Sequence, residues 1–136
     1  MKFNFLILLL CTFVLGSCSS NDDSTEIIQE DIIETEDAAP NGIFIDFAHP
    51  TSGTATVNTD QTVLNLTDFK SDDGPLLELY LTTGLDVQDY VSLGVLKGLD
   101  GDYAYTLPTD IDLNTYNHIV VWCVDFSVNF GYAILK

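Results

Sequence analysis

The chain has 136 residues, of which 46% are hydrophobic, and it carries 21 acidic residues against four Lys or Arg residues, for a net charge of −17. There is no arginine, so the clustered positive charge that nucleic acids and anionic membrane surfaces require is missing, and we expect no nucleic-acid partner. Anionic substrates would be repelled, which leaves cationic partners, metal cations and neutral ligands.

The N-terminus predicts export. Lys2 precedes an apolar run from Phe3 to Val14, which is too short to span a bilayer comfortably and is typical of a signal peptide. The following Leu-Gly-Ser-Cys resembles the bacterial lipobox, which implies cleavage before Cys18 and acylation of that cysteine. We therefore expect a lipoprotein signal peptide over residues 1–17 and a stable membrane anchor, because two or more acyl chains hold a protein where one would not. A plain signal peptide followed by a chance cysteine is the alternative.

Residues 18–40 differ from the rest of the chain in composition. They hold eight acids and no Lys or Arg, and Ile27-Ile28 and Ile32-Ile33 are their only apolar pairs. Such a segment cannot bury enough apolar surface to fold, so we expect a disordered acidic tether that ends near Pro40.

The start of this tether also bears on localisation. Ser19 does not resemble an inner-membrane retention signal, and Asn21-Asp22-Asp23 resembles the acidic surface-export signals of some Gram-negative lipoproteins. An acidic linker with no addressing role is an equally good interpretation. We expect an outer-membrane lipoprotein of the cell envelope, facing either the periplasm or the cell surface.

Residues 41–136 are long enough for one domain with a modest core. Short apolar segments separated by Gly, Pro, Asp and Thr predict an all-β fold, a single antiparallel β-sandwich or jelly roll. A small α/β fold is the alternative, but no segment has the 3.6-residue periodicity of a crossover helix. The expected strands lie in Ile43–Phe47, Thr54–Val57, Thr62–Leu66, Leu76–Leu81, Tyr90–Leu96, Tyr103–Leu107 and the C-terminal run 119–135.

The C-terminal run is too long for one ordinary strand, so we expect a bend near residues 125–127. Cys123 would then occupy the last position before the bend, near the rim of the sandwich, on the face of Ile119 and Val121 and opposite Trp122. In the second strand, simple alternation places Val128, Phe130, Tyr132 and Ile134 on one face and Asn129, Gly131 and Ala133 on the other.

Several short motifs occur in a recognisable order. They include His-x-x-x-Gly-x-Ala at 49–55, Gly-Pro at 74–75, Leu-Gly-x-Leu-Lys-Gly at 93–98 and Trp-Cys-x-x-Phe-x-Val-x-Phe-Gly-x-Ala at 122–133. Over residues 42–135 the chain resembles the DM-thirteen domain family, called the "electron transfer DM" domain.

The resemblance implies a β-rich extracytoplasmic domain whose cysteine acts in redox chemistry, either as a bare thiol or as the ligand of a haem-type group. That cysteine corresponds to Cys123. Members of the family often carry an Asp after the Gly-Pro pair, and this chain has Leu76 there, so any site that uses the Asp is altered.

Considered without the resemblance, Cys123 is either a small buried hydrophobe or a reactive thiol. A reactive thiolate needs positive charge nearby, and the domain carries 13 acids and three lysines. Of the candidate cations we prefer His49 as the partner, because it lies beside a turn within the family motif; a turn histidine bonded to backbone is the alternative. The other candidates are Lys70, Lys97 and His118.

We expect no metal site. His118 and Cys123 are five residues apart, so in one strand they face opposite sides and cannot share a copper ion, and zinc needs more Cys and His ligands than the domain has. The acids of 100–102 and 110–114 lack a complete calcium loop and are interpreted as turn residues.

Two functions follow. The first is a lipid-anchored redox or electron-transfer domain of the cell envelope, centred on Cys123 and assisted by His49, with an unknown redox or protein partner. The alternative is a non-catalytic surface binding module for a glycan or protein, and in either case a stand-alone enzyme is the less favoured class. A thiol in a pocket near His49 would favour the redox function, and a buried thiol without polar neighbours would favour the binding module.

Overall fold

The computed structural model describes residues 38–136, and within it Ala39–Lys136 form one compact unit. The predicted signal peptide, the acylated Cys18 and the tether up to residue 37 lie outside the described residues. The described part is built from strands and turns, and it contains no helix that is long and apolar enough to cross a membrane.

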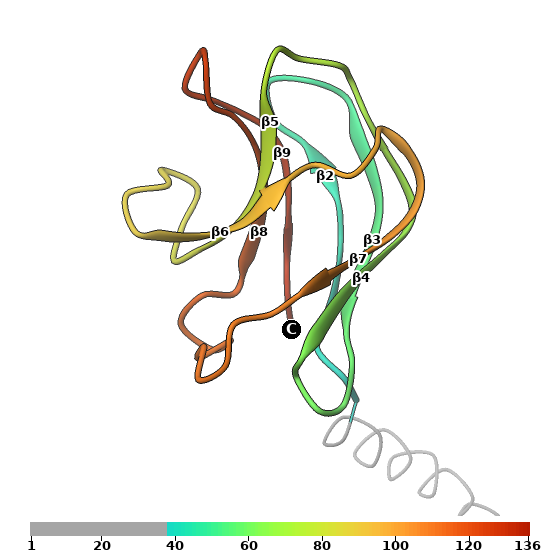
Figure 1. Cartoon of the computed structure of the whole chain (residues 1–136), viewed down its shortest axis with the longest axis vertical. Coiled ribbons are helices and arrows are strands. Elements are labelled where there is room, and N and C mark those ends of the chain that lie inside the picture. The colour runs from blue at the N-terminus through green and yellow to red at the C-terminus, as the bar shows by residue number, and fades with distance from the viewer. Residues whose placement is uncertain (1–37) are drawn as a thin grey trace, which may run out of the picture. The chain divides into compact units, whose positions relative to one another are not determined.

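Nine strands form two antiparallel sheets that pack face to face, as Figure 1 shows. The predicted all-β sandwich is confirmed, and since the described residues contain no crossover helix, the α/β alternative is wrong. The four-stranded sheet has the order β1 (Asn41–Ile43), β3 (Thr51–Val57), β4 (Val63–Ser71), β7 (Asp100–Thr106). The five-stranded sheet has the order β2 (Ile45–Asp46), β9 (Val128–Ile134), β8 (His118–Cys123), β5 (Leu77–Thr82), β6 (Tyr90–Val95).

The core lies between the sheets and follows from the alternation of side chains along each strand. In β8, Ile119, Val121 and Cys123 point into the core, while Val120 and Trp122 belong to a separate cluster on the outer face. The predicted division of β8 between its two faces is therefore confirmed.

Phe44 closes one side of the sandwich, where the chain passes from β1 in one sheet to β2 in the other. Its side chain is buried and makes an edge-to-face contact with Phe69, with ring centroids 5.1 Å apart. The Phe44 N–H donates to the Gly53 carbonyl at 2.8 Å, so the crossing strand is held to β3 by backbone as well as by packing.

The predicted alternation in β9 is wrong because the β8–β9 ladder contains a bulge. Val121 pairs with Gly131 and Trp122 pairs with Asn129, so Phe130 is an extra residue in β9. Phe130 remains in the core, and the residues beyond the bulge change face relative to the simple alternation. Tyr132 consequently lies on the outer face with Val120 and Trp122, while Gly131 faces inward.

Gly131 is required because β3 passes closely over it. A Cβ at Gly131 would lie 2.2 Å from Oγ1 and 2.3 Å from Cβ of Thr51, which is a buried residue of the opposite sheet. The absence of a side chain at Gly131 thus allows the two sheets to approach each other closely at this point.

We predict that Gly131→Ala lowers the free energy of unfolding by about 1–3 kcal/mol, the usual cost of overpacking a core. Gly84→Ala is the matched control, because a Cβ there meets only Asp86 Oδ1 at 3.5 Å, an ordinary contact. Chemical denaturation followed by circular dichroism measures both variants. Equal stability of the two would contradict the close approach of Thr51.

Candidate functional site

Cys123 is the last residue of β8 and is a free cysteine. Its strand neighbours are Leu77 in β5 and Val128 in β9, and its side chain is 0% exposed within the main core cluster. Among the described residues its sulfur makes no recorded hydrogen bond. The predicted place before the bend is observed, with a turn over residues 124–127, but the thiol is enclosed by apolar side chains.

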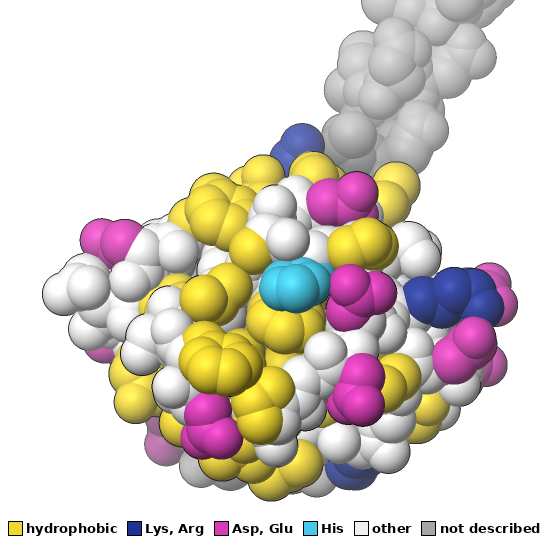
Figure 2. Space-filling model, turned by 90° about the horizontal axis from the view of Figure 1, so that it is seen from above, with side chains coloured by type: hydrophobic (Ala, Val, Ile, Leu, Met, Phe, Trp, Pro, Cys, Tyr) yellow, Lys and Arg dark blue, Asp and Glu magenta, His cyan; other side chains and the backbone are white. Residues whose placement is uncertain are grey.

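His49 lies between β2 and β3, at the same end of the sandwich. Its imidazole stacks on Phe130, with ring centroids 3.9 Å apart and planes inclined by 28°, and its Nδ1 lies 3.1 Å from Oδ2 of Asp72. Its backbone N–H donates to the Phe130 carbonyl at 3.0 Å. Figure 2 looks onto the end of the sandwich where the β8–β9 turn lies, and a histidine there is bordered by hydrophobic and acidic side chains.

Phe130 joins the surroundings of His49 to those of Cys123. A Cβ at Gly74 would lie 3.0 Å from both Phe130 Cζ and Leu77 Cδ2, so the Phe130 ring reaches the Gly74 turn beside Leu77. Leu77 is the cross-strand neighbour of Cys123. The structure therefore brings the two predicted site residues to one end of the fold, but the recorded contacts of His49 are with Phe130 and Asp72, not with the thiol.

Position 76 lies at this same end. The Leu76 carbonyl accepts a hydrogen bond from the Val124 N–H at 2.9 Å, which places it against the residue that follows Cys123. The sequence marked Leu76 as a departure from the resembled family, and the structure shows that its side chain is not part of the core cluster that encloses Cys123.

The candidate cations are engaged elsewhere. Lys70 forms an exposed ion pair with Asp100 at 2.8 Å, which raises the pKa of Lys70. The Lys97 ammonium donates to the Ala104 carbonyl and lies 4.9 Å from the centre of the Tyr105 ring. Neither lysine supplies the positive charge that would activate Cys123.

His118 lies at the other end of β8 and on its outer face, beside Thr82 and Ile134. The prediction that the side chains of His118 and Cys123 face opposite sides of β8 is thus confirmed. Burial lowers the pKa of His118, and its Nδ1 is buried without a hydrogen-bond partner among the described residues.

The surroundings of Cys123 do not fit a haem-type group. Two pockets open near this end of the described chain, of ≈ 200 Å³ between residues 73–77 and 95–99 and of ≈ 230 Å³ beside Pro50 and Asp72, and Cys123 lines neither. Over residues 38–136, no group of three or more His, Cys, Asp or Glu side chains could hold a metal ion.

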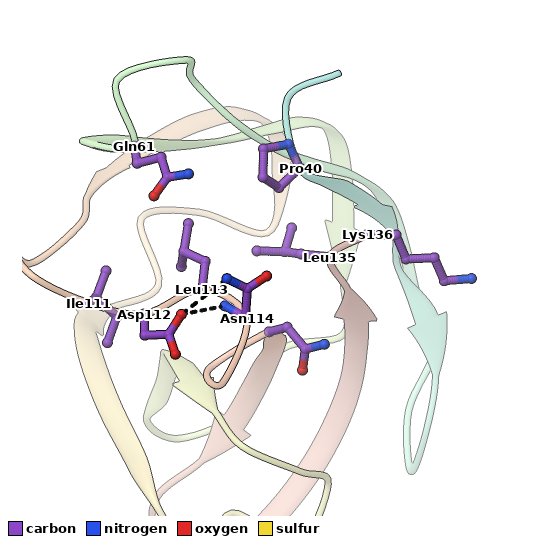
Figure 3. A pocket seen from close by; sticks show the side chains of 9 residues that line it. Pro40, Gln61, Ile111, Asp112, Leu113, Asn114, Leu135 and Lys136 are labelled. Atoms are coloured by element: carbon purple, nitrogen blue, oxygen red, sulfur yellow. Dashed lines mark hydrogen bonds between the residues drawn. The ribbon is translucent and has the colours of Figure 1, made fainter. Parts of the chain in front are cut away.

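The acids of residues 100–102 and 110–114 include two carboxylates that accept hydrogen bonds within the domain. In the pocket beside the C-terminus, Asp112 Oδ1 accepts hydrogen bonds from the backbone N–H of Asn114 at 3.0 Å and from its side-chain amide at 3.3 Å (Figure 3). Bonds from Thr115 and Asn114 lower the pKa of Asp112. Asp102 Oδ1 likewise accepts from the Asp68 N–H at 2.8 Å. Asp110 lies in a turn, as expected, whereas Asp100 and Asp102 lie in β7, so their interpretation as turn residues is wrong.

Sequence reasoning missed Asp72 and Phe130 as partners of His49. Phe130 stands in the C-terminal motif, which was its only signal, and Asp72 was one of several turn acids. No local pattern could single out either one, because 23 residues separate His49 from Asp72.

A family model described as Electron transfer DM13 matches residues 43–135 of the chain, which confirms the family resemblance. The match covers β2 to β9 and includes Cys123, His49 and position 76. No curated protein and no solved structure matches the chain.

We predict that the protein loses stability as the pH falls below the usual His pKa of 6.5, because His118 resists protonation in the fold and accepts a proton readily when unfolded. The unfolded chain then binds more protons, so the free energy of unfolding falls with pH until the lowered pKa of the folded state is passed. Denaturation at pH from about 7.5 to about 5 should show a shallower fall in His118→Gln. His49→Gln, which removes the other imidazole, is measured beside it for comparison. A wild-type slope in His118→Gln would refute the assignment.

Proposed function

Because this chain belongs to the Electron transfer DM13 family, we propose that it is a lipid-anchored electron-transfer domain of the cell envelope in which Cys123 is the redox-active group. The observation that carries the proposal is the family match, which spans β2 to β9 and encloses the one cysteine of the described residues. The position of Cys123 at the end of β8, where two loops meet, supports it.

We favour a thiol over a haem ligand for Cys123, since its surroundings do not fit a large planar group. A fully buried thiol exchanges electrons only when a reactant can reach it. The β8–β9 turn is short and leaves Phe126 68% exposed, so opening this hairpin end would disturb less of the core than opening the sheet centre.

His49 is proposed to assist indirectly. Its ring packs on Phe130, and Phe130 packs beside Leu77, the neighbour of Cys123. The pair of His49 with Asp72 is exposed and therefore weak, so it would break at low cost. His49 would thus control access to the thiol through Phe130.

The anchor and location are proposed on the sequence. The apolar leader, the lipobox at Cys18 and the acidic segment after it support attachment to the outer membrane through lipid. The tether would hold the domain away from the membrane, with a redox protein as the expected partner.

We predict that glutathione disulfide converts the Cys123 thiol of the natively purified protein to a mixed disulfide with release of one glutathione thiolate, that excess dithiothreitol restores the thiol, and that Cys123→Ser does neither. Thiol titration in native buffer and in denaturant, together with an absorption spectrum, measures the thiol and any bound chromophore in one sample. Cys123→Ala is the packing control, because Ser places a hydroxyl in an apolar core at a cost of roughly 1–3 kcal/mol. A thiol that reacts only on unfolding, in a protein with no chromophore, would exclude the redox role.

If His49 controls access, His49→Ala should raise the rate of Cys123 modification in native buffer several-fold, because the Phe130 ring loses the group stacked on it. Phe126→Ala is the control, since Phe126 lies in the turn next to Cys123 and has no recorded contact with His49 among the described residues. The rate of modification is followed with a chromogenic disulfide reagent. The rates are compared under conditions in which the variants have the same free energy of unfolding. Equal rates in both variants would rule out this role of His49.

A further inference from the structure

The outer face of the five-stranded sheet carries a second cluster that the redox proposal does not use. Its members are apolar or aromatic and point away from the main core, and Val120 at its centre is 0% exposed. They are Tyr80, Val87, Val120, Trp122 and Tyr132. Such a cluster on an outer face is unusual, because the open face of a sandwich sheet is ordinarily polar.

Three rings of this face are nearly parallel. Tyr80 and Tyr90 stack with centroids 4.2 Å apart and planes 12° apart, and Tyr80 and Trp122 have centroids 6.3 Å apart and planes 23° apart. Tyr80 is 5% exposed whereas Tyr90 is 48% exposed, so Tyr90 covers Tyr80 and its opposite ring face is left to solvent. Trp122 is partly exposed beside them. The face therefore offers flat aromatic surface on β6 and on β8.

Polar groups lie on both sides of Trp122. Its neighbour in β5 is Glu78, whose Oε2 accepts a hydrogen bond from Ser92 at 2.8 Å. Its neighbour in β9 is Asn129, which is 4% exposed and whose Oδ1 and Nδ2 have no hydrogen-bond partner among the described residues. Buried amides are ordinarily hydrogen-bonded, so the Asn129 amide is a group that a ligand with hydroxyl groups could bind.

The charges of this face restrict what that ligand is. Lys70 pairs with Asp100 and Lys97 binds Ala104, both at the four-stranded sheet, so neither is available to hold an anion here. Glu78 beside Trp122 already accepts a bond from Ser92, and Asp89 beside Tyr90 accepts one from the Tyr116 hydroxyl at 3.0 Å, so these two acids are engaged with neutral donors. An amide, which both donates and accepts, suits the hydroxyl groups of a neutral ligand.

We propose that this face binds a neutral glycan. Sugar rings would stack on Tyr90 and Trp122, while Glu78 and, after a small rotation, the Asn129 amide would bind hydroxyl groups. Tyr90 and Trp122 stand two strands apart, about 10 Å, so the site fits an oligosaccharide better than a monosaccharide. The inference is independent of the redox role, since Cys123 faces the opposite side of the sheet.

The protein can report its own binding because it has one tryptophan. We expect neutral hexasaccharides of the glucan, mannan, xylan and galactan types to include at least one that changes Trp122 fluorescence saturably. Tyr90→Ala should weaken that binding at least tenfold, whereas Phe126→Ala, which removes an exposed ring outside this face, should leave it unchanged. Circular dichroism establishes that both variants are folded.

Two further probes separate a neutral glycan from a charged ligand. Polygalacturonate should not bind, and hexalysine should not displace a bound sugar. Glu78→Gln should retain most of the sugar affinity, because a side-chain amide also binds hydroxyl groups. The proposal fails if none of the four hexasaccharides changes the fluorescence, if Tyr90→Ala binds like Phe126→Ala, or if hexalysine alone binds and Glu78→Gln abolishes its binding. Failure here would leave the thiol chemistry of Cys123 unaffected.

Discussion

The register shift between β8 and β9 at Phe130 decides what each face of the five-stranded sheet carries. The extra residue keeps Phe130 in the core and turns Tyr132 outward. Without the bulge, the inward position of Gly131 against Thr51 would be lost, and a larger side chain would separate the sheets. The same irregularity therefore positions the ring on which His49 stacks and completes the aromatic cluster on the opposite face.

The alternation along β8 explains why the domain combines a buried thiol with a partly exposed aromatic face. Cys123 and Trp122 are consecutive, and the alternation of β8 sends the thiol into the core and the indole to the outside. Burial protects Cys123 from solvent and from the many acids, and it also withholds the positive charge that would activate a thiolate. Any redox chemistry at Cys123 thus depends on local opening of the rim, whereas binding on the outer face requires no such opening.

The negative charge of the domain limits the partners available both for redox chemistry at Cys123 and for binding on the outer face. With 13 acids and three lysines on residues 41–136, the surface repels anions, and the lysines at 70 and 97 are already held by acceptors of the four-stranded sheet. The carboxylates of Asp102 and Asp112 are likewise held, by a backbone donor of β4 and by donors of the loop around Asn114 respectively. The acidic composition therefore excludes anionic ligands. Recognition of a partner is left to neutral groups, namely the Cys123 thiol on the inner face of the five-stranded sheet and the aromatic cluster on its outer face.

The sequence by itself determined the fold class, the family and the position of Cys123 at the end of a strand before a turn. These follow from local signals, namely the two-residue alternation, the turn residues and short motifs, and each of them is readable within a few neighbouring positions. The alternation also gave the correct faces for Trp122 and Cys123, because β8 is regular up to its end.

Only the tertiary structure decided the faces of β9 and the partners of His49. A bulge is a property of two paired strands, so alternation read along β9 alone placed Tyr132 and Asn129 on opposite faces, although both lie on the outer face. The contact of His49 with Asp72 closes a gap of 23 residues, and its stack on Phe130 joins a loop near the start of the domain to β9 near its C-terminus. Such contacts depend on how the sheets pack, and that packing is set by close approaches such as the one between Gly131 and Thr51.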